Sequence, residues 1–302
     1  MYGVIRKIRQ FNLPVVCQLD LFDKMVLPVL LYGCEIWGFE NLDIIERVHL
    51  KFLKHILYLK SSTPNYMVYG ETGRFPLSVI IYSRIVSYWC KLLNSTDKKI
   101  SCILYQYLIA NSQYEIVKNP WIDCVHRIFD SCGLSHIWNE QFYYHLNQDW
   151  VTAVVKQRLQ DQFIQKWYSD INSSSKGILY KTFKTNFEYE NYLSILPLKF
   201  RKILVKFRTT NHRLPVELGR WTGIPLNERL CTLCDAKHVA DEFHFILECN
   251  ALSKIRKKYI NEYYFTRPNI LKFSQLMTKQ DAMSLKKLCM FISKIYDLVC
   301  PP

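Results

Sequence analysis

Three cysteines and a histidine lie close together in the stretch CTLCDAKHVADEFHFILEC, which runs from Cys231 to Cys249. Their spacing is C-x2-C-x9-H-x4-C, in which Cys231 and Cys234 form a C-x-x-C pair and His244 and Cys249 follow in a later segment. The paired cysteines can turn both sulfurs onto one ion, and the later histidine and cysteine complete a tetrahedron. Three thiolates and one imidazole suit structural Zn²⁺, which leaves no open coordination position. The sequence therefore predicts one structural zinc ion, held by Cys231, Cys234, His244 and Cys249.

His238 is the alternative histidine ligand in the same stretch. We favour His244 because the sequence DEFHFILEC places it directly before an apolar helical run that anchors it to the fold, whereas His238 lies among small and charged residues. Unliganded core thiols and a redox-active C-x-x-C are two further interpretations. We expect the other cysteines to be small buried hydrophobic residues on apolar stretches: Cys17, Cys34, Cys90, Cys102, Cys124, Cys132, Cys289 and Cys300.

The chain is strongly basic, with 40 Lys and Arg against 26 Asp and Glu in 302 residues and a formal net charge of +14. An excess of this size favours polyanionic partners, nucleic acid first and an anionic membrane surface second. The excess is concentrated, because residues 199–258 contain thirteen Lys and Arg against six Asp and Glu. Aromatic residues are interleaved with these cations, as in surfaces that hold phosphates and stack on unpaired bases. The alternative is a solvated basic face over an aromatic core.

We predict that this basic segment contacts RNA or DNA, and that Phe207 or Trp221 stacks on a base. The side chains predicted to make the contacts are Lys202, Lys206, Arg208, His212, Arg213, Arg220, Trp221, Arg256, Lys257 and Lys258.

The elements that must position these side chains are predicted to be mainly helical. Apolar residues recur every three or four positions in residues 41–60, 78–110, 119–170 and 285–299. The sequence therefore predicts a mainly α fold, a helical bundle or array with a small zinc knuckle near the C-terminus. We expect five parts: 1–60, a helical region 61–171, a linker and connecting helix 172–198, the basic metal-binding region 199–260, and a helical tail 261–302. Within them, 60–77 is predicted to be a turn-rich connector and 172–177 (NSSSKG) a flexible linker.

No secretory signal and no membrane span are predicted. The longest apolar run near the start, MVLPVLLYGC, has about ten residues, interrupted by Pro28 and followed by Glu35, so it is too short to cross a bilayer. We therefore expect an intracellular protein of the nucleus or cytoplasm, with reduced cysteines and without a membrane partner or small-molecule substrate.

Three motifs carry a resemblance to a known family. The stretches FDKMVLPVLLYGCEIWG and HRLPVELGRW, together with the C-x2-C-x9-H-x4-C motif, resemble the C-terminal part of non-LTR (LINE-type) retrotransposon reverse transcriptases. Pro28 to Trp37 looks like the segment after the polymerase palm, where thumb-like helices begin, and the cysteine motif looks like the family's C-terminal zinc-binding region. The resemblance implies that residues 1–60 are thumb-like and that the chain grips template RNA or target DNA.

The catalytic residues of that family have no counterpart in this sequence. The family's polymerase site uses an aromatic-x-Asp-Asp turn to bind two magnesium ions, and this chain contains no Asp-Asp pair. It contains no Pro-Asp dipeptide for a restriction-type endonuclease either. We therefore expect a truncated, non-catalytic, nucleic-acid-binding fragment rather than an enzyme. The alternative is a helical protein-interaction or structural module, or a mobile-element remnant without a function.

Overall fold

A computed structural model of the chain describes residues 3, 5, 6, 13–95, 99–112, 119–141 and 147–299. This part of the chain is mainly helical, which confirms the predicted fold class. Its β structure is limited to two isolated antiparallel bridges, Thr72 with Tyr189 and Leu230 with Val239. Within the same residues, no helix combines the length and apolarity needed to cross a bilayer.

The helices divide into two compact units. Unit 1 comprises residues 1–10, 19–50 and 75–167, and unit 2 comprises residues 11–18, 51–74 and 168–302. Three helices have residues in both units: α2 (Val15–Leu21), α5 (Leu42–Ile56) and α11 (Gln148–Ser173). Because unit 2 is built from three separate segments, its core depends on residues far apart in the sequence.

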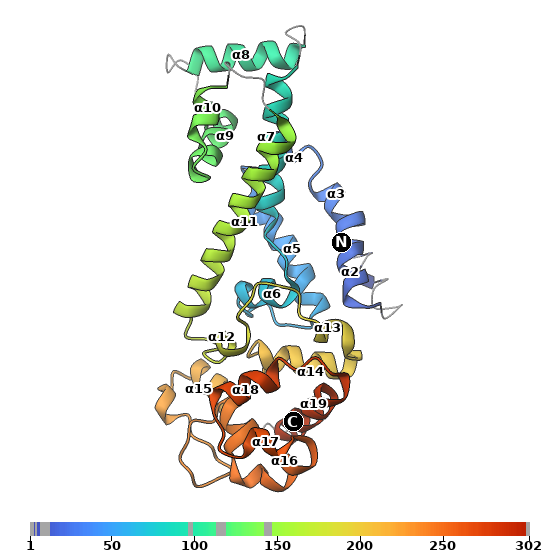
Figure 1. Cartoon of the computed structure of the whole chain (residues 1–302), viewed down its shortest axis with the longest axis vertical. Coiled ribbons are helices and arrows are strands. Elements are labelled where there is room, and N and C mark those ends of the chain that lie inside the picture. The colour runs from blue at the N-terminus through green and yellow to red at the C-terminus, as the bar shows by residue number, and fades with distance from the viewer. Residues whose placement is uncertain are drawn as a thin grey trace. The chain divides into compact units, whose positions relative to one another are not determined.

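Helix α7 (Leu77–Leu93) passes through the core of unit 1, and α8 crosses one of its ends (Figure 1). Apolar side chains surround α7 instead of forming one stripe, which is typical of a helix enclosed by other helices. Its Trp89 is buried, lies 4.8 Å from Phe129 between ring centroids, and donates to the Tyr105 hydroxyl at 2.8 Å. The other elements of unit 1 are η1 (Phe22–Val26), α3 (Leu27–Leu30), α4 (Cys34–Trp37), α8 (Ile100–Ser112), α9 (Pro120–Ser131) and α10 (Ser135–Asn139).

Unit 2 contains the basic segment and the cysteine motif. Helix α14 (Leu198–Arg208) packs against α19 (Ala282–Val299), and α16 (Ser253–Tyr259) packs against α19 as well. The remaining elements are α6 (Asn65–Thr72), α12 (Tyr180–Phe183), α13 (Tyr192–Ile195), α15 (Pro215–Trp221), η2 (Leu226–Glu228), η3 (His244–Glu248), η4 (Asn250–Leu252), α17 (Glu262–Phe265) and α18 (Ile270–Met277).

Helix α6 lies where the sequence predicted a turn-rich connector. Pro64 directly precedes the helix, and Gly73 follows it with a φ of 61°, the left-handed conformation that glycine adopts without a steric penalty. Proline is common at the start of a helix and glycine just past its end, and both residues are also common in turns. The residues between them are therefore helical, and they carry Glu71 into the interior of unit 2.

In the segment 172–177, predicted to be a flexible linker, the first two residues end helix α11, and Lys176 and Gly177 pack within unit 2. The Tyr66 hydroxyl donates to the carbonyl oxygen of Lys176 at 2.9 Å, and Lys176 itself is buried. Gly177 approaches Met67 so closely that a Cβ at this position would lie 2.2 Å from the Met67 Cε. Glycine at position 177 therefore allows a close backbone contact that a larger residue would block.

A buried ion pair joins Glu71 of α6 to Arg208 of α14. Neither side chain is exposed, and the guanidinium Nε lies 3.2 and 3.1 Å from the two carboxylate oxygens. A second carboxylate, on Glu190, lies 2.9 Å from Nη2, and the Met277 carbonyl oxygen accepts from Nη1 at 2.8 Å. Arg208 therefore connects α6, α14, α18 and the residues before α13.

Two further side chains complete this network. The Tyr192 hydroxyl donates to Glu71 at 2.5 Å, and Lys184 lies 2.6 Å from the second oxygen of Glu190. Burial and the nearby Glu71 raise the pKa of Tyr192 well above its usual value, so the hydroxyl keeps its proton and remains a donor. Two carboxylates thus face two cations, and the network balances its own charge.

Breaking this network by removing one partner should destabilise unit 2. We expect Arg208→Ala to lower the free energy of unfolding by about 3–5 kcal/mol, because Glu71 is left as an uncompensated buried charge. The double variant Glu71→Leu/Arg208→Met should lose less than Arg208→Ala, because it removes both charges and fills the space. Urea unfolding followed by circular dichroism measures both.

Lys287→Ala, an exposed substitution on α19, serves as the control for this experiment and should change stability by less than about 0.5 kcal/mol. Equal stability of Arg208→Ala and the unmodified protein would contradict the role assigned to the pair.

Candidate metal centre and basic surface

Cys231, Cys234, His244 and Cys249 come together in unit 2. Their ligand atoms all lie within 4.8 Å of one another, so a single ion can reach all four. The Cys231 and Cys249 sulfurs are 3.9 Å apart, and the Cys234 sulfur is 3.4 Å from His244 Nε2. The cluster predicted from the spacing is therefore a site that can hold a metal ion.

A short hairpin positions the first two cysteines. Leu230 and Val239 form an antiparallel bridge, and the Cys231 backbone N–H donates to the His238 carbonyl oxygen at 2.9 Å. Within the loop, the Leu233 backbone N–H lies 3.4 Å from the Cys231 sulfur and points at it. This contact fixes the position of the Cys231 sulfur within the loop.

A π-helical turn positions His244 and Cys249. At 3.6 residues per turn, residues five apart on an α-helix face directions about 140° apart. Residues His244–Glu248 instead form η3, whose wider turn closes with a 2.8 Å hydrogen bond from the Cys249 N–H to the His244 carbonyl oxygen. The wider turn brings residues five apart to one side, which matches the H-x4-C spacing. Asp241 starts the turn, since its Oδ1 accepts from the His244 N–H at 2.8 Å.

His244, rather than His238, is the histidine of the cluster. Its Nε2 faces Cys234, while its Nδ1 lies 3.4 Å from Glu248 Oε2. The exposed His238 contacts the same carboxylate oxygen through its own Nδ1, at 3.1 Å. Donation of the His244 Nδ1–H to Glu248 leaves Nε2 as the metal-binding nitrogen, the arrangement by which carboxylates commonly orient histidine ligands.

Arg256 stabilises the segment on the C-terminal side of the cluster through hydrogen bonds. Its side chain is 3% exposed, and its Nε and Nη2 donate to the carbonyl oxygens of Ile246 and Cys249, each at 2.8 Å. These carbonyl groups lie at the end of η3, where a helix leaves its acceptors without intrahelical partners. Arg256 thus ties α16 to the segment that carries His244 and Cys249.

Burial shifts the pKa values of the ligands in different directions. It raises the pKa of Cys249 to about 12, and the nearby Cys231 adds to this increase. Burial also opposes ionisation of Cys234, but the Ala236 backbone N–H and the neighbouring thiols outweigh it and lower that pKa. Burial lowers the pKa of His244, which keeps the imidazole neutral and able to bind a metal. Metal binding therefore releases the proton that Cys249 holds at neutral pH.

Six cysteines outside the cluster are buried, as predicted: Cys34, Cys90, Cys102, Cys124, Cys132 and Cys289. Burial raises the pKa of Cys90 and Cys289 to about 12, so these thiols stay protonated and unreactive. Cys17 is exposed, contrary to the expectation, and Cys300 lies outside the described residues.

Three of the predicted nucleic-acid contacts are interior side chains, and the prediction is corrected for them. Arg208 and Arg256 are buried with their charges satisfied by Glu71 and by backbone carbonyl oxygens, respectively. The side chain of His212 is 1% exposed, and its Nε2 donates to Glu242 at 2.8 Å while its Nδ1 accepts from a backbone N–H. Phe207 is buried as well, so it cannot stack on a base.

The other predicted contacts are at least partly accessible. Arg213, Trp221, Lys257 and Lys258 are exposed, with 66% exposure for Trp221. The half-buried ones are Lys202, Lys206 and Arg220. The Lys202 ammonium lies 3.8 Å from the centre of the Tyr58 ring, and Arg220 Nε lies 3.5 Å from a Glu217 carboxylate oxygen.

Lys254 is an exposed cation missing from the predicted set. It lies on α16 with Lys257 and Lys258, at positions i, i+3 and i+4, so the three ammonium groups share one face of the helix. Arg256 points inward from the same helix. The i, i+3, i+4 spacing of the three lysines is the feature of the sequence that indicates a shared helical face and would have included Lys254 among the predicted contacts.

No protein-family model, curated protein or solved structure significantly matches this chain.

Loss of one sulfur should release the metal and destabilise the protein. We expect Cys234→Ser to lower the bound metal well below one ion per chain and the melting temperature by roughly 5–10 °C, since metal-binding energy contributes to folding. Elemental analysis and calorimetry measure the two effects. Cys17→Ser, at an exposed cysteine outside the cluster, should change neither. A melting temperature of the wild-type protein that is unchanged by chelator would contradict the metal site.

The two histidines and Glu248 should have distinguishable effects on metal affinity. His244→Asn should lose the ion, whereas His238→Asn should retain one ion per chain. Glu248→Gln should weaken affinity by about 10–100-fold, because the carboxylate orients the His244 ring. Competition with a chromophoric chelator measures all three, and loss of the ion from His238→Asn but not from His244→Asn would reverse the assignment.

Proposed function

We propose that this chain is a non-catalytic nucleic-acid-binding protein, in which a structural zinc ion holds the fold of a basic region that grips RNA or DNA phosphates. The observation that carries the proposal is the distribution of charge. Unit 2 contains 26 Lys and Arg against 13 Asp and Glu, a formal +13, whereas unit 1 contains 14 against 13. Nearly all of the chain's basic excess thus belongs to the unit that contains the cysteine cluster, and a field of one sign attracts a polyanion.

The donor set and its spacing support zinc as the metal. In a tetrahedral zinc site with Zn–S of about 2.3 Å and Zn–N of about 2.0–2.1 Å, two sulfurs lie about 3.8 Å apart and a sulfur and a nitrogen about 3.6 Å apart. The corresponding separations here are 3.9 Å and 3.4 Å. Three thiolates and Zn²⁺ leave one net negative charge, which the guanidinium of Arg256 stabilises.

The lysine face of α16 is the part of unit 2 that we expect to meet phosphates. Arg256 holds this short helix against η3, while Lys254, Lys257 and Lys258 project from it into solvent. Exposed ammonium groups keep their hydration until they meet a phosphate, and they bind it without sequence preference. The zinc ion would thus not touch the nucleic acid. It would fix the segment that precedes α16 and so hold the lysines of α16 in position.

We further propose that the chain derives from the C-terminal part of a LINE-type reverse transcriptase. The motifs between Pro28 and Trp37 and between Cys231 and Cys249 support this origin, and the lack of an Asp-Asp pair in the sequence supports a role without polymerase chemistry.

Removing the α16 lysines should weaken binding and reduce its dependence on salt. For the variant K254A/K257A/K258A, we plot the logarithm of the association constant for single-stranded RNA against the logarithm of the salt concentration. We expect the magnitude of the negative slope to decrease by about 2, since each phosphate contact contributes about 0.7. The loss of affinity should be similar for unrelated sequences. Fluorescence anisotropy across a salt series measures both quantities.

The matched control removes the same charge from exposed lysines of unit 1, in K91A/K156A/K166A. It should keep the wild-type slope. Equal slopes for the two triple variants would contradict the assignment to α16, and salt-independent or undetectable binding by the wild-type protein would contradict the proposed function.

A further inference from the structure

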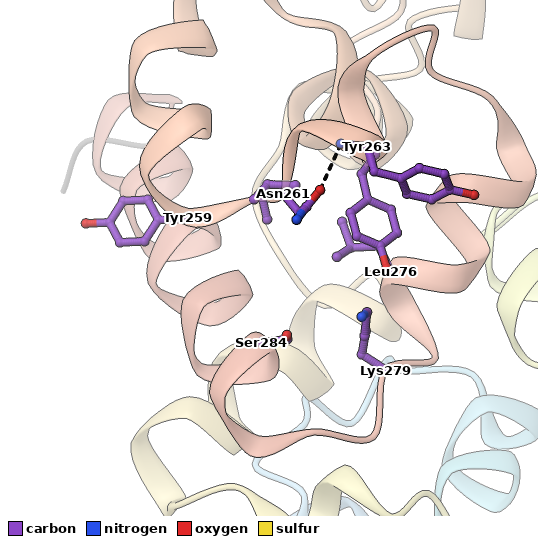
Figure 2. A pocket seen from close by; sticks show the side chains of 8 residues that line it. Tyr259, Asn261, Tyr263, Leu276, Lys279 and Ser284 are labelled. Carbon is purple, nitrogen blue, oxygen red and sulfur yellow. Dashed lines mark hydrogen bonds between the residues drawn. The ribbon is translucent and has the colours of Figure 1, made fainter.

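A hollow of about 320 Å³ opens in unit 2 beside the end of α16. It begins at Tyr259, the residue after Lys258, and is lined further by α17, α18 and the start of α19. Figure 2 shows the Asn261 amide and the Lys279 ammonium directed into the same space, with Ser284 beside it and the Tyr259 ring pointing away. The lining thus combines aromatic rings, one cation, one amide and one hydroxyl.

Two tyrosines form the aromatic part of this hollow. Their ring centroids are 5.2 Å apart and the ring planes meet at 82°, so Tyr263 and Tyr264 form a corner. Tyr263 is 54% exposed although its hydroxyl contacts Gln275 at 3.2 Å and the Lys272 ammonium lies 4.7 Å from the centre of its ring, whereas Tyr264 is buried at the base. An accessible aromatic ring held in a fixed orientation offers a stacking surface to a planar ligand.

The polar groups of the hollow are arranged for a ligand with a polar edge and a negative charge. Asn261 Oδ1 accepts from the Tyr263 N–H at 2.9 Å, which orients the amide and turns its NH₂ group to other acceptors. The Lys279 ammonium lies 5.6 Å from the centre of the Tyr264 ring, and its charge acts on the exposed Asp281 carboxylate, which Ser284 also contacts. A volume near the lower end of the range for ligand pockets suits one aromatic ring system.

We propose that this hollow receives an unpaired nucleobase of a single strand, whose neighbouring phosphates lie on Lys279 and on the lysine face of α16. This inference rests on the proposed function and adds to it the type of nucleic acid. The base would stack on Tyr263 and place its edge against Asn261 and Ser284. A base paired within a duplex cannot enter, because its faces are covered by neighbouring base pairs, so the site distinguishes single strands from duplexes.

The test measures binding of the full chain to a twelve-nucleotide single strand with a central 2-aminopurine, and to a duplex of the same sequence. We expect Tyr263→Leu to weaken single-strand binding about tenfold, within the range for loss of one aromatic stack, and to leave duplex binding unchanged. Tyr263→Phe should retain affinity and the quenching of 2-aminopurine, because it keeps the ring and removes only the contact with Gln275. Lys279→Gln should lower the salt slope by about 0.7.

Tyr107→Leu is the matched control, since Tyr107 is 62% exposed on α8 of unit 1, and it should bind as the wild-type protein does. Single-strand binding by Tyr263→Leu that equals the wild type would overturn the base pocket while leaving the proposed function intact. Absence of any binding by the wild-type protein would instead remove the proposed function itself. Complete competition by millimolar AMP would identify a mononucleotide site and also overturn the assignment to a strand.

Discussion

The buried pair of Glu71 and Arg208 is the constraint around which unit 2 is built. Moving a carboxylate and a guanidinium out of water costs several kcal/mol for each ion, and only a complete set of partners offsets this cost. The set here draws on α6, α14, α18 and the residues around α13, so these elements must assemble together. Apolar contacts tolerate small shifts, whereas a guanidinium with two carboxylates and a carbonyl oxygen accepts one arrangement.

The cost of burying a charge also explains why arginines and lysines occupy different places in the basic segment. Its fully buried cations are all arginines, namely Arg201, Arg208 and Arg256. The exposed ones are mostly lysines, among them those of α16. A planar guanidinium with five donors can satisfy several carbonyl and carboxylate oxygens in an interior, whereas an ammonium is strongly hydrated and favours the surface. Part of the net charge therefore stabilises the fold, and the remainder is available to a polyanion.

The cluster of three cysteines and one histidine and the mainly helical fold could be predicted because their signals are local. All four ligands lie within nineteen residues, and helical periodicity repeats every few positions. The partners of Arg208 and His212 were not predicted, since Glu71 lies 137 residues from the first and Glu242 lies 30 residues from the second. Helix α6 was missed because its proline and glycine are equally typical of turns. The predicted nucleic-acid contacts included the buried Arg208 and Arg256 because the prediction treated arginine and lysine as equivalent cations.

The sequence separation between Glu71 and Arg208 has a consequence for biosynthesis. Helix α6 leaves the ribosome long before α14, so its carboxylate must wait in a solvated, unpaired state while 137 further residues are translated. Pairings between such distant segments form slowly, because the entropy of closing a long loop is lost before the contact is gained. Unit 2 therefore reaches its native arrangement only after α14 and α18 have left the ribosome, which makes it a late-folding part of the nascent chain.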